Sequence, residues 1–366
     1  MRFVDVNPFF FPYKGGIERR MDDLAKRLAE RGHEVTILTA RLPGTAEEEV
    51  AESGYRIVRV KSRFLNVYNP PYVSSSGVLE ALKSLDADVV NYNYRWAPSW
   101  NKDLARYRGP KLFTVHNMWN EGIGLQAKAS SINDRRFMKN VLPSFGHIVC
   151  VSRHVQDATV ALGYPREMTS FVPCCLSEEP APNESPEGDY ILSLGRIVKT
   201  KGLRYMVEAM KDVDSKLVIC GKGPETKRLQ RQIASSGLQD KVEMRGFVSE
   251  EEKSRLMDGC RLFVMPSLFE SFGLAAIELM SHGRPIVCTN VNGLPDTVGD
   301  GGITVDPADP KALAEAMNRL LGDEDLRKDM GRKALEHARS YSYDRFIGKY
   351  EGILEAVAKG ETPDPD

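Results

Sequence analysis

The sequence predicts an α/β protein made of two doubly wound parallel-sheet domains. Apolar runs of strand length alternate with amphipathic helical stretches along most of the chain, which is typical of parallel sheets covered by helices. The 366 residues exceed one ordinary core and suit two domains of about 170 residues each. A stretch rich in Pro, Glu and Ser at 177–188 interrupts the alternation, as an exposed interdomain linker would.

The first predicted domain covers residues 1–177. Its helix from about Ile17 to Gly32 is indicated by Met21, Leu24 and Leu28, which recur at helical spacing. Six apolar runs are predicted strands: Phe3–Val6, Glu34–Thr39, Arg56–Val60, Asp88–Tyr92, Lys111–Val115 and His147–Val151.

The second predicted domain covers residues 188–340. Asp309 is a good N-cap and Pro310 suits a first helical position, so a helix is expected over Ala312–Leu321, followed by another from about Glu324 to Arg339. A last amphipathic helix is expected within 343–360. Five apolar runs are predicted strands: Tyr190–Leu194, Lys216–Cys220, Lys241–Arg245, Arg261–Met265 and Pro285–Cys288.

The composition is that of a soluble globular protein, with 42% hydrophobic and 28% charged residues. No apolar run approaches the ~20 residues of a membrane span, and the N-terminus lacks a signal-peptide pattern. The six cysteines have no metal-ligand spacing, and we expect buried reduced thiols. A cytoplasmic enzyme is the prediction.

The net charge of −1 hides an asymmetry: residues 1–177 hold 24 Lys+Arg against 18 Asp+Glu, and the remainder holds 26 against 33. Two interpretations stay open, a solvated face or a surface that meets anionic lipid headgroups or an acidic acceptor. Nucleic acid is not expected, because no binding module is present. The clustered cations are Arg19, Arg20, Lys26, Arg27 and Arg31 in one helix, and Arg56, Arg59, Lys61 and Arg63 further on.

The segment 261–282 places chemistry after a buried strand. Pro266 ends the strand, Gly273 opens a turn, and a helix is predicted to follow. A helix N-terminus there could hold a phosphate on its unpaired backbone N–H groups. Glu270 lies in the loop and Glu278 in the helix, so both carboxylates can face one ligand.

Glu270 and Glu278, with SFGLAAI between them, resemble the E-x7-E signature of retaining GT-B glycosyltransferases, most closely family 4 (glycosyl transferases group 1). The resemblance covers nearly the whole chain. It implies two Rossmann-like domains facing across a cleft, an acceptor side in the first and a nucleotide-sugar side in the second. It also implies that the last helix crosses back to the first domain near Tyr341–Asp344.

A nucleotide sugar brings a diphosphate whose negative charge grows as the glycosidic bond breaks, so cations are needed beside it. Gly195-Arg196 after a strand and Lys199-Thr200-Lys201-Gly202 before a helix are similar to the family's GR…KG pattern. We expect Arg196 and Lys201 to clamp the diphosphate, with Lys199 as a spare cation. A basic loop that merely caps a helix is the structural alternative.

Three first-domain sites follow from the resemblance. Gly15 and Gly16, between a strand and a helix, would contact phosphate or sugar, although a simple tight turn is the alternative. His116, in TVHN at a strand end, would orient the transferred sugar. Ser152 would contact sugar or acceptor, or merely cap a helix.

The second domain would hold the rest of the donor. By resemblance, the turn with Gly221 and Gly223 lies near the phosphates, and Phe247-Val248 lies against the nucleobase, unless Phe247 is a buried core residue. Glu278 would accept hydrogen bonds from the ribose, and Glu270 would contact the sugar hydroxyls. Ser271, Phe272, Gly273 and Leu274 would meet phosphate and sugar, the last three through their amides.

The function expected from this resemblance is metal-independent, retaining transfer of a hexosyl unit from a nucleotide-diphospho-sugar to a sugar, lipid-linked or small-molecule acceptor, with no cofactor. The departing phosphate would deprotonate the acceptor on the same face of the sugar. Asp212-Val213-Asp214 has the spelling of a metal motif but precedes a strand, at the wrong end of the sheet. A nucleotide-sugar epimerase and a noncatalytic nucleotide-sugar-binding protein are the alternatives. Peripheral contact with the inner face of the cell membrane is a further expectation.

Overall fold

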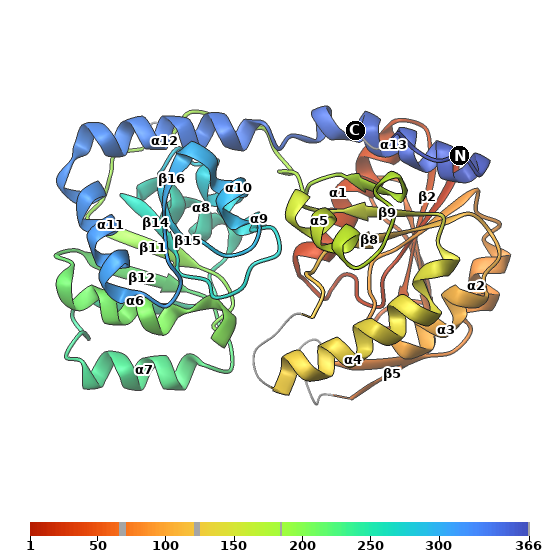
Figure 1. Ribbon diagram of the computed structural model, residues 1–366, viewed down its shortest axis with the longest axis horizontal. Coiled ribbons are helices and arrows are strands. Elements are labelled where there is room, and N and C mark those ends of the chain that lie inside the picture. The colour runs from red at the N-terminus through yellow and green to blue at the C-terminus, as the bar shows by residue number, and fades with distance from the viewer. Residues whose placement is uncertain (66–70, 121–124, 184, 365–366) are drawn as a thin grey trace. The chain divides into compact units, whose positions relative to one another are not determined.

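The computed structural model describes residues 1–65, 71–120, 125–183 and 185–364. The chain divides into two compact units (Figure 1). Unit 1 comprises Met1–Cys174 together with Tyr343–Asp366, and unit 2 comprises Cys175–Ser342. Each unit is built on its own parallel sheet, which confirms the predicted α/β class.

Unit 1 contains an eight-stranded sheet in the order β10-β9-β8-β7-β1-β2-β4-β3. All pairs are parallel except β3 with β4, and β5 with β6 form a separate antiparallel hairpin. The strands β3, β5, β6 and β10 were not predicted; they are short or exposed, and so carry little apolar signal. The strands are β1 (Arg2–Val6), β2 (Glu34–Ala40), β3 (Glu48–Val50), β4 (Arg56–Val60), β5 (Ser62–Leu65), β6 (Tyr72–Ser75), β7 (Val89–Tyr92), β8 (Lys111–Val115), β9 (His147–Cys150) and β10 (Thr169–Phe171).

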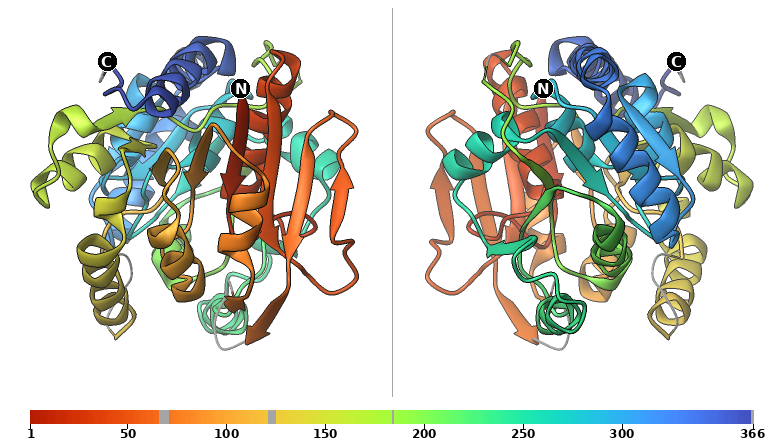
Figure 2. Two further views of the ribbon diagram at one scale, coloured as in Figure 1. Left: turned by 90° about the vertical axis from the view of Figure 1, so that its right-hand side faces the viewer. Right: turned by 90° about the vertical axis from the view of Figure 1, so that its left-hand side faces the viewer.

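Helices cover both faces of this sheet because alternate strand residues point to opposite sides. Val4 and Val6 join a core with Trp100, on the side of α2 (Val78–Ser84), α3 (Pro98–Arg106), α4 (Leu125–Asn140) and α5 (Arg153–Ala161). Phe3 instead meets the Tyr350 ring edge-on at 6.3 Å, on the side of α1 (Gly16–Glu30) and α13 (Tyr343–Lys359). Figure 2 (left panel) shows β1 and β2 side by side, with the C-terminal helix α13 near the N-terminus.

The C-terminal helix is tied to unit 1 by charge as well as by packing. Glu351 of α13 pairs with Arg31 and with His33, each at 2.6 Å. Hydrogen bonds from both partners hold the pKa of Glu351 below its usual value, the bond from Arg31 contributing most. A segment more than 300 residues away in sequence thereby completes the face of the sheet that α1 begins.

The predicted clusters of surface cations, on α1 and at 56–63, are wrong in part. Arg20 is 2% exposed and lies over the Tyr350 ring, and Arg59 is 3% exposed and donates to the carbonyls of Ala46 and Phe11. These two cations therefore belong to the interior of unit 1. The face of α1 that looks basic in the sequence is partly buried, because α13 packs against α1.

Unit 2 contains a six-stranded parallel sheet in the order β13-β12-β11-β14-β15-β16. Its core gathers Met206, Leu229 and Leu313 against Leu217 and Val264 of the sheet. The side chain of Asp309 caps its helix by accepting from the amide of Ala312 at 3.0 Å, as predicted. The strands are β11 (Tyr190–Leu194), β12 (Lys216–Cys220), β13 (Val242–Gly246), β14 (Leu262–Met265), β15 (Ile286–Thr289) and β16 (Gly302–Val305), and the helices are α6 (Leu203–Ala209), α7 (Thr226–Ser235), α8 (Glu250–Gly259), α9 (Leu274–Met280), α10 (Leu294–Val298), α11 (Pro310–Gly322) and α12 (Glu324–Arg339).

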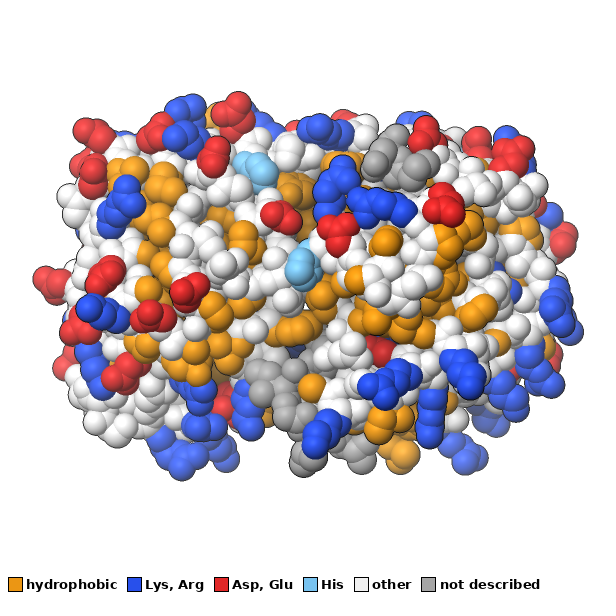
Figure 3. All heavy atoms as spheres, viewed as in Figure 1, with side chains coloured by type: hydrophobic (Ala, Val, Ile, Leu, Met, Phe, Trp, Pro, Cys, Tyr) orange, Lys and Arg blue, Asp and Glu red, His pale blue; other side chains and the backbone are white. Residues whose placement is uncertain are grey.

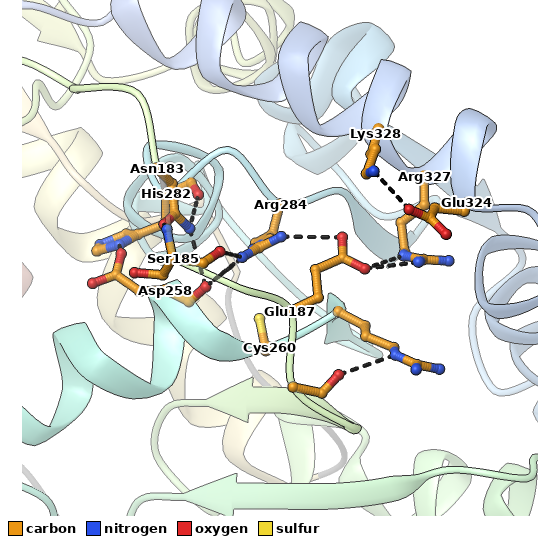
Figure 4. A network of polar contacts seen from close by, with 12 residues as sticks. Asn183, Ser185, Glu187, Asp258, Cys260, His282, Arg284, Glu324, Arg327 and Lys328 are labelled. Atoms are coloured by element: carbon orange, nitrogen blue, oxygen red, sulfur yellow. Dashed lines mark hydrogen bonds and ion pairs between the residues drawn. The ribbon is translucent and has the colours of Figure 1, made fainter.

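The segment expected to be an exposed interdomain linker is anchored to unit 2. Glu187 accepts from Arg284 at 3.0 Å and from Arg327 at 2.7 Å, and it lies between the two guanidinium groups (Figure 4). The side-chain amide of Asn183 donates to the carbonyls of Asp258 and His282. The polar composition predicted an exposed segment, but the same polar side chains attach the segment to unit 2.

Two expectations about class can be compared with the described residues. All six cysteines are buried, as expected, and none is joined in a disulfide. Within the described ranges, none of the helices combines the length and the apolar character that crossing a bilayer requires.

Candidate active site

The loops at the carboxyl ends of β11, β12 and β13 form one interlocked edge of unit 2. The amide of Gly195 donates to the carbonyl of Cys220 at 3.0 Å, and that of Gly221 donates to the carbonyl of Gly246 at 2.6 Å. A Cβ on Gly221 would lie 1.8 Å from the carbonyl oxygen of Gly195, and one on Gly223 would lie 2.2 Å from that of Ile197. These glycines are therefore required by loop packing, whatever they also contribute to a ligand.

A second clip joins the loop after β11 to the loop after β14. The amide of Leu268 donates to the carbonyl of Thr200 at 2.7 Å. Gly202, at φ 62°, passes so close to Pro266 that a Cβ would lie 1.8 Å from its carbonyl oxygen. This backbone contact holds the two loops together, so that Lys201 and Glu270 lie side by side and form an ion pair.

Arg196 differs from Lys201 in its surroundings. It is exposed and makes no ion pair within the described residues, while Lys201 and Glu270 are only partly exposed. Both cations line a small pocket together with Gly195 and Ser267. An anion that reached this edge would meet one unpaired guanidinium and one ammonium whose partner it could replace.

Glu278 lies on α9 and has a cation of its own. Its carboxylate accepts from the ammonium of Lys253 on α8 at 2.6 Å. The helix begins after Gly273, at φ 92°, and spans seven residues, so its dipole is short. The side chains of Ser271 and Phe272 are buried. A ligand at this turn would therefore contact the backbone more than these side chains.

Phe247 does not belong to the core. It is 74% exposed directly after β13, so the alternative of a buried phenylalanine is wrong. The neighbouring Val248 is half-buried. An aromatic ring held in solvent at the end of a strand can stack on a planar group.

In unit 1, His116 follows β8 and is nearly buried, with 9% exposure. Its Nε2 lies 2.8 Å from the Oδ1 of Asn93. Burial, and then the charges of Arg20 and Arg95, lower the pKa of His116 well below its usual value. The imidazole is therefore neutral at physiological pH.

The loop after His116 is braced by a buried ion pair. Arg95 donates to the carbonyls of Asn117 at 3.2 Å and Met118 at 2.6 Å, and its Nε lies 2.7 Å from the Oδ1 of Asp134. Asp134 in turn accepts from the amide of Asn120 at 2.8 Å. Sequence reasoning missed both charged residues. A signal existed, since Asp134 shares a helix face with Phe137 and a carboxylate on an apolar face needs a partner.

The Gly15-Gly16 turn lies against the side chain of Glu18. A Cβ on Gly15 would lie 2.4 Å from the Oε2 of Glu18, whose Oε1 accepts from the side-chain amide of Asn7 at 3.2 Å. Burial raises the pKa of Glu18 to about 7. Gly16 is the first residue of α1.

Ser152 caps α5. Its hydroxyl oxygen accepts from the amide of Val155 at 3.0 Å, which is the structural alternative considered for this residue. It is 5% exposed, and contact with a substrate stays a prediction.

Among the described residues, no group of three or more His, Cys, Asp or Glu side chains could hold a metal ion. Asp212 and Asp214 precede β12, at the opposite end of that strand from the interlocked loops.

The comparisons with known proteins cover both units. Residues 14–179 match the model of Glycosyltransferase Family 4, and residues 177–337 match that of Glycosyl transferases group 1. The 2-deoxystreptamine N-acetyl-D-glucosaminyltransferase of Niallia circulans is 30% identical, over 94% of this chain and 100% of its own length.

Solved structures share the fold at low identity. Sucrose-phosphate synthase from Thermosynechococcus elongatus superposes with a TM-score of 0.78 at 19% identity, covering 99% of this chain and all of that one. Anabaena HepE in complex with UDP and glucose gives 0.76 at 17% identity, covering 97% and 100%. The fold is therefore GT-B, and the chain belongs to the family 4 (group 1) glycosyltransferases.

Proposed function

We propose that this glycosyltransferase moves a hexosyl unit from a nucleotide-diphospho-sugar to a sugar, lipid-linked or small-molecule acceptor, with retention of configuration and without a metal ion. The observation that carries the proposal is the pairing of Lys201 with Glu270 beside the exposed Arg196. A structural neighbour of the same fold holds UDP and glucose, which supports a nucleotide-sugar donor.

The chemistry follows from the charge that develops in the reaction. The bond between the sugar's anomeric carbon and the diphosphate oxygen breaks, and its electron pair adds one negative charge to a diphosphate that already carries two. Arg196 offers a guanidinium for bidentate contact, and Lys201 offers an ammonium. When the diphosphate takes Lys201 as its partner, Glu270 becomes free to accept hydrogen bonds from the sugar hydroxyls.

The acceptor hydroxyl then attacks the anomeric carbon from the face that the diphosphate leaves. Its oxygen forms the new glycosidic bond, and its proton passes to the departing phosphate oxygen. No protein nucleophile is needed in this scheme, and the ionised phosphate serves as the base. Fixed cations supply the electrostatic stabilisation that a divalent ion supplies elsewhere.

The remaining assignments complete the donor and sugar contacts. In unit 2, Glu278 would accept from the ribose hydroxyls after release from Lys253, and the exposed Phe247 would stack on the base beside Val248. The amides at 272–274 and the turn at 221–223 would line the phosphates. In unit 1, His116, Ser152 and the Gly15-Gly16 turn would contact sugar, phosphate or acceptor.

A transfer assay tests the proposal. The full-length protein is incubated in EDTA with UDP-, GDP- and ADP-linked hexoses, and hydrolysis or transfer to a panel of sugars is followed by mass spectrometry, with the anomeric configuration of the product read by NMR. Turnover in EDTA with the donor's configuration kept is the expected result. An inverted product, an epimerised donor, or turnover that needs added Mg²⁺ would contradict it.

Peripheral contact with anionic membrane is a separate part of the proposal. Exposed cations lie on α3 and α4, close to the exposed Ile132, and Lys and Arg side chains gather over this part of unit 1 (Figure 3). Such a surface suits a lipid-linked acceptor. Sedimentation with phosphatidylglycerol vesicles should fall when the α4 cations are changed to Glu; equal sedimentation of the variant would remove this part. The cations on α3 are Lys102 and Arg106, and those on α4, which the variant changes, are Lys128, Arg135, Arg136 and Lys139.

A further inference from the structure

A buried network of amides and one carboxylate ends at His116. It is built from the three neighbouring strands β1, β7 and β8 and contains Asp5, Asn91, Asn93 and Thr114, each at most 3% exposed. Buried polar side chains destabilise a core unless each is paired. These are largely paired with one another, and the chain of contacts ends at a residue proposed to bind substrate.

The orientation of the Asn93 amide is determined by its neighbours. Its Nδ2 lies 2.6 Å from the Oδ1 of Asp5 and 3.2 Å from the carbonyl oxygen of Val6, and an ionised carboxylate and a carbonyl can only accept. A flipped amide would place its own oxygen against both of these oxygens. The Oδ1 of Asn93 must therefore face the Nε2 of His116.

Asn91 confirms this assignment independently. Its Nδ2 donates to the Oδ1 of Asp5 at 2.8 Å and to the Oδ1 of Asn93 at 3.2 Å. Its own Oδ1 accepts from the hydroxyl of Thr114 at 2.8 Å. Burial raises the pKa of Asp5 to about 6, so its carboxylate remains mainly ionised above neutral pH and available as an acceptor.

The network leaves one tautomer for His116. The ring is neutral and carries a single proton, and the atom facing Nε2 is an amide oxygen that can only accept. The proton must therefore be on Nε2. Nδ1 then carries a lone pair, and it has no hydrogen-bond partner among the described residues.

We infer that Asp5 and Asn93 are positioning residues that hold His116 as the Nε2–H tautomer, so that its Nδ1 accepts a hydrogen bond from a substrate hydroxyl. This inference rests on the proposed function for the identity of the substrate, and the tautomer itself does not. It also limits His116 to orienting the substrate and excludes a role as general acid, because a neutral ring whose one proton is bonded to Asn93 has no proton to donate at Nδ1. A sugar hydroxyl fits this acceptor, and a phosphate or carboxylate oxygen does not.

The test is the tautomer in the free, full-length protein. Histidine labelled with ¹⁵N is incorporated, and long-range ¹H–¹⁵N correlation at pH 8 separates pyrrole-type from pyridine-type nitrogens; His116→Gln assigns the signal among the six histidines. We expect a pyrrole-type Nε2 that carries a slowly exchanging proton, and a pyridine-type Nδ1. The reverse pattern would overturn the inference, whatever the activity.

Three variants separate positioning from simple support of the fold. Asn93→Leu removes the acceptor, and the protected Nε2 proton should be lost. Asn93→Asp keeps an oxygen facing the ring, and the proton should remain on Nε2. The second oxygen of the new carboxyl group lies against Asp5, and a proton shared by the two carboxyl groups replaces the amide hydrogen there. Asp22→Asn is the matched control, because this carboxylate is also buried in unit 1 but bonds to Tyr55 and Lys26 instead. A protected proton in Asn93→Leu, or its loss in Asp22→Asn, would contradict the assignment.

Kinetics with the donor found in the transfer assay complete the test. Asn93→Leu should lower kcat/KM roughly tenfold, the size of one hydrogen bond, and Asn93→Asp should recover part of it. Unchanged kcat/KM in Asn93→Leu would remove the substrate half of the inference. Absence of turnover in the wild type would remove the proposed function while the measured tautomer still decides the positioning half.

Discussion

Two ion pairs in this protein look alike as contacts and differ in their surroundings. The Arg95–Asp134 pair of unit 1 has side chains 4% and 2% exposed, and both partners also bond to the loop after His116. The Lys201–Glu270 pair of unit 2 has side chains 23% and 16% exposed. The first pair is part of the fold. The second is exposed enough for a ligand to replace one partner. The His116 region of unit 1 is therefore fixed by a buried ion pair, whereas the Lys201 edge of unit 2 can exchange Glu270 for an anionic ligand.

The largest expected effect is on the buried pair. Asp134→Ala leaves the Arg95 guanidinium buried without its carboxylate, which should lower the free energy of unfolding of unit 1 by about 3–5 kcal/mol. All three tryptophans lie in unit 1, so urea unfolding followed by tryptophan fluorescence reports on that unit.

The matched control for this prediction is Asp157→Ala. It removes an exposed partner of Arg166 and should change stability by less than about 1 kcal/mol. Equal effects of the two substitutions would erase the difference between a buried and an exposed ion pair.

A second prediction concerns the buried carboxyl of Glu18. Its pKa of about 7 exceeds the ordinary 4.5, so the folded state keeps a proton that the unfolded state loses. The contribution of Glu18 to the free energy of unfolding is therefore constant below about pH 4.5, falls as the pH rises toward 7, and stays lowered above it. Glu18→Gln should remove this loss, and its advantage over the wild type should grow by about 3 kcal/mol between pH 4.5 and pH 8. A pH-independent difference in urea midpoints would show that Glu18 is not buried as a proton-binding group.

The third prediction addresses the cationic edge of unit 2. Lys201→Ala or Arg196→Ala should slow transfer about a hundredfold, or ~2.7 kcal/mol, because each removes charge stabilisation of the leaving diphosphate. Neither should move the urea midpoint of unit 1. Steady-state kinetics provide the measurement, with the exposed Lys199→Ala as control; near-wild-type rates in both variants would rule out the clamp.

The smallest effect is expected at Glu278. Its replacement by Ala should raise the donor KM about tenfold while kcat changes little, because a ribose contact is equally strong in the ground state and the transition state. Lys253→Met, which removes a cationic partner of Glu278 in the free protein, should leave KM within a few-fold. A loss confined to kcat would move Glu278 from ribose binding to the reacting centre.

Most strands of the two sheets and the long C-terminal helices could be predicted from the sequence because they depend on local patterns. The predicted strand at Lys111–Val115 and the helix from Glu324 to Arg339 match the structure, since apolar periodicity and caps are read residue by residue. The edge strand β3, with no buried residue, could not be found that way.

The candidate site shows the same division. The loop glycines and the Lys201 loop were visible as motifs that follow strands. The burial of Arg20, Arg95 and Asp134 could not be predicted, because it depends on helices that are distant in the chain. The Asp5–Asn93 network was missed for a related reason: β1 and β7 are adjacent only after folding, so no spacing in the sequence relates these residues.

The most direct test of the exchangeable cationic edge is calorimetric binding of the nucleoside diphosphate of the active donor, in EDTA, to the wild type and to Lys201→Ala. Binding by the wild type without metal, weakened at least tenfold in Lys201→Ala and strengthened in Glu270→Gln, is the predicted result. Binding that appears only after Mg²⁺ is added, or that is equal in all three proteins, would contradict the account.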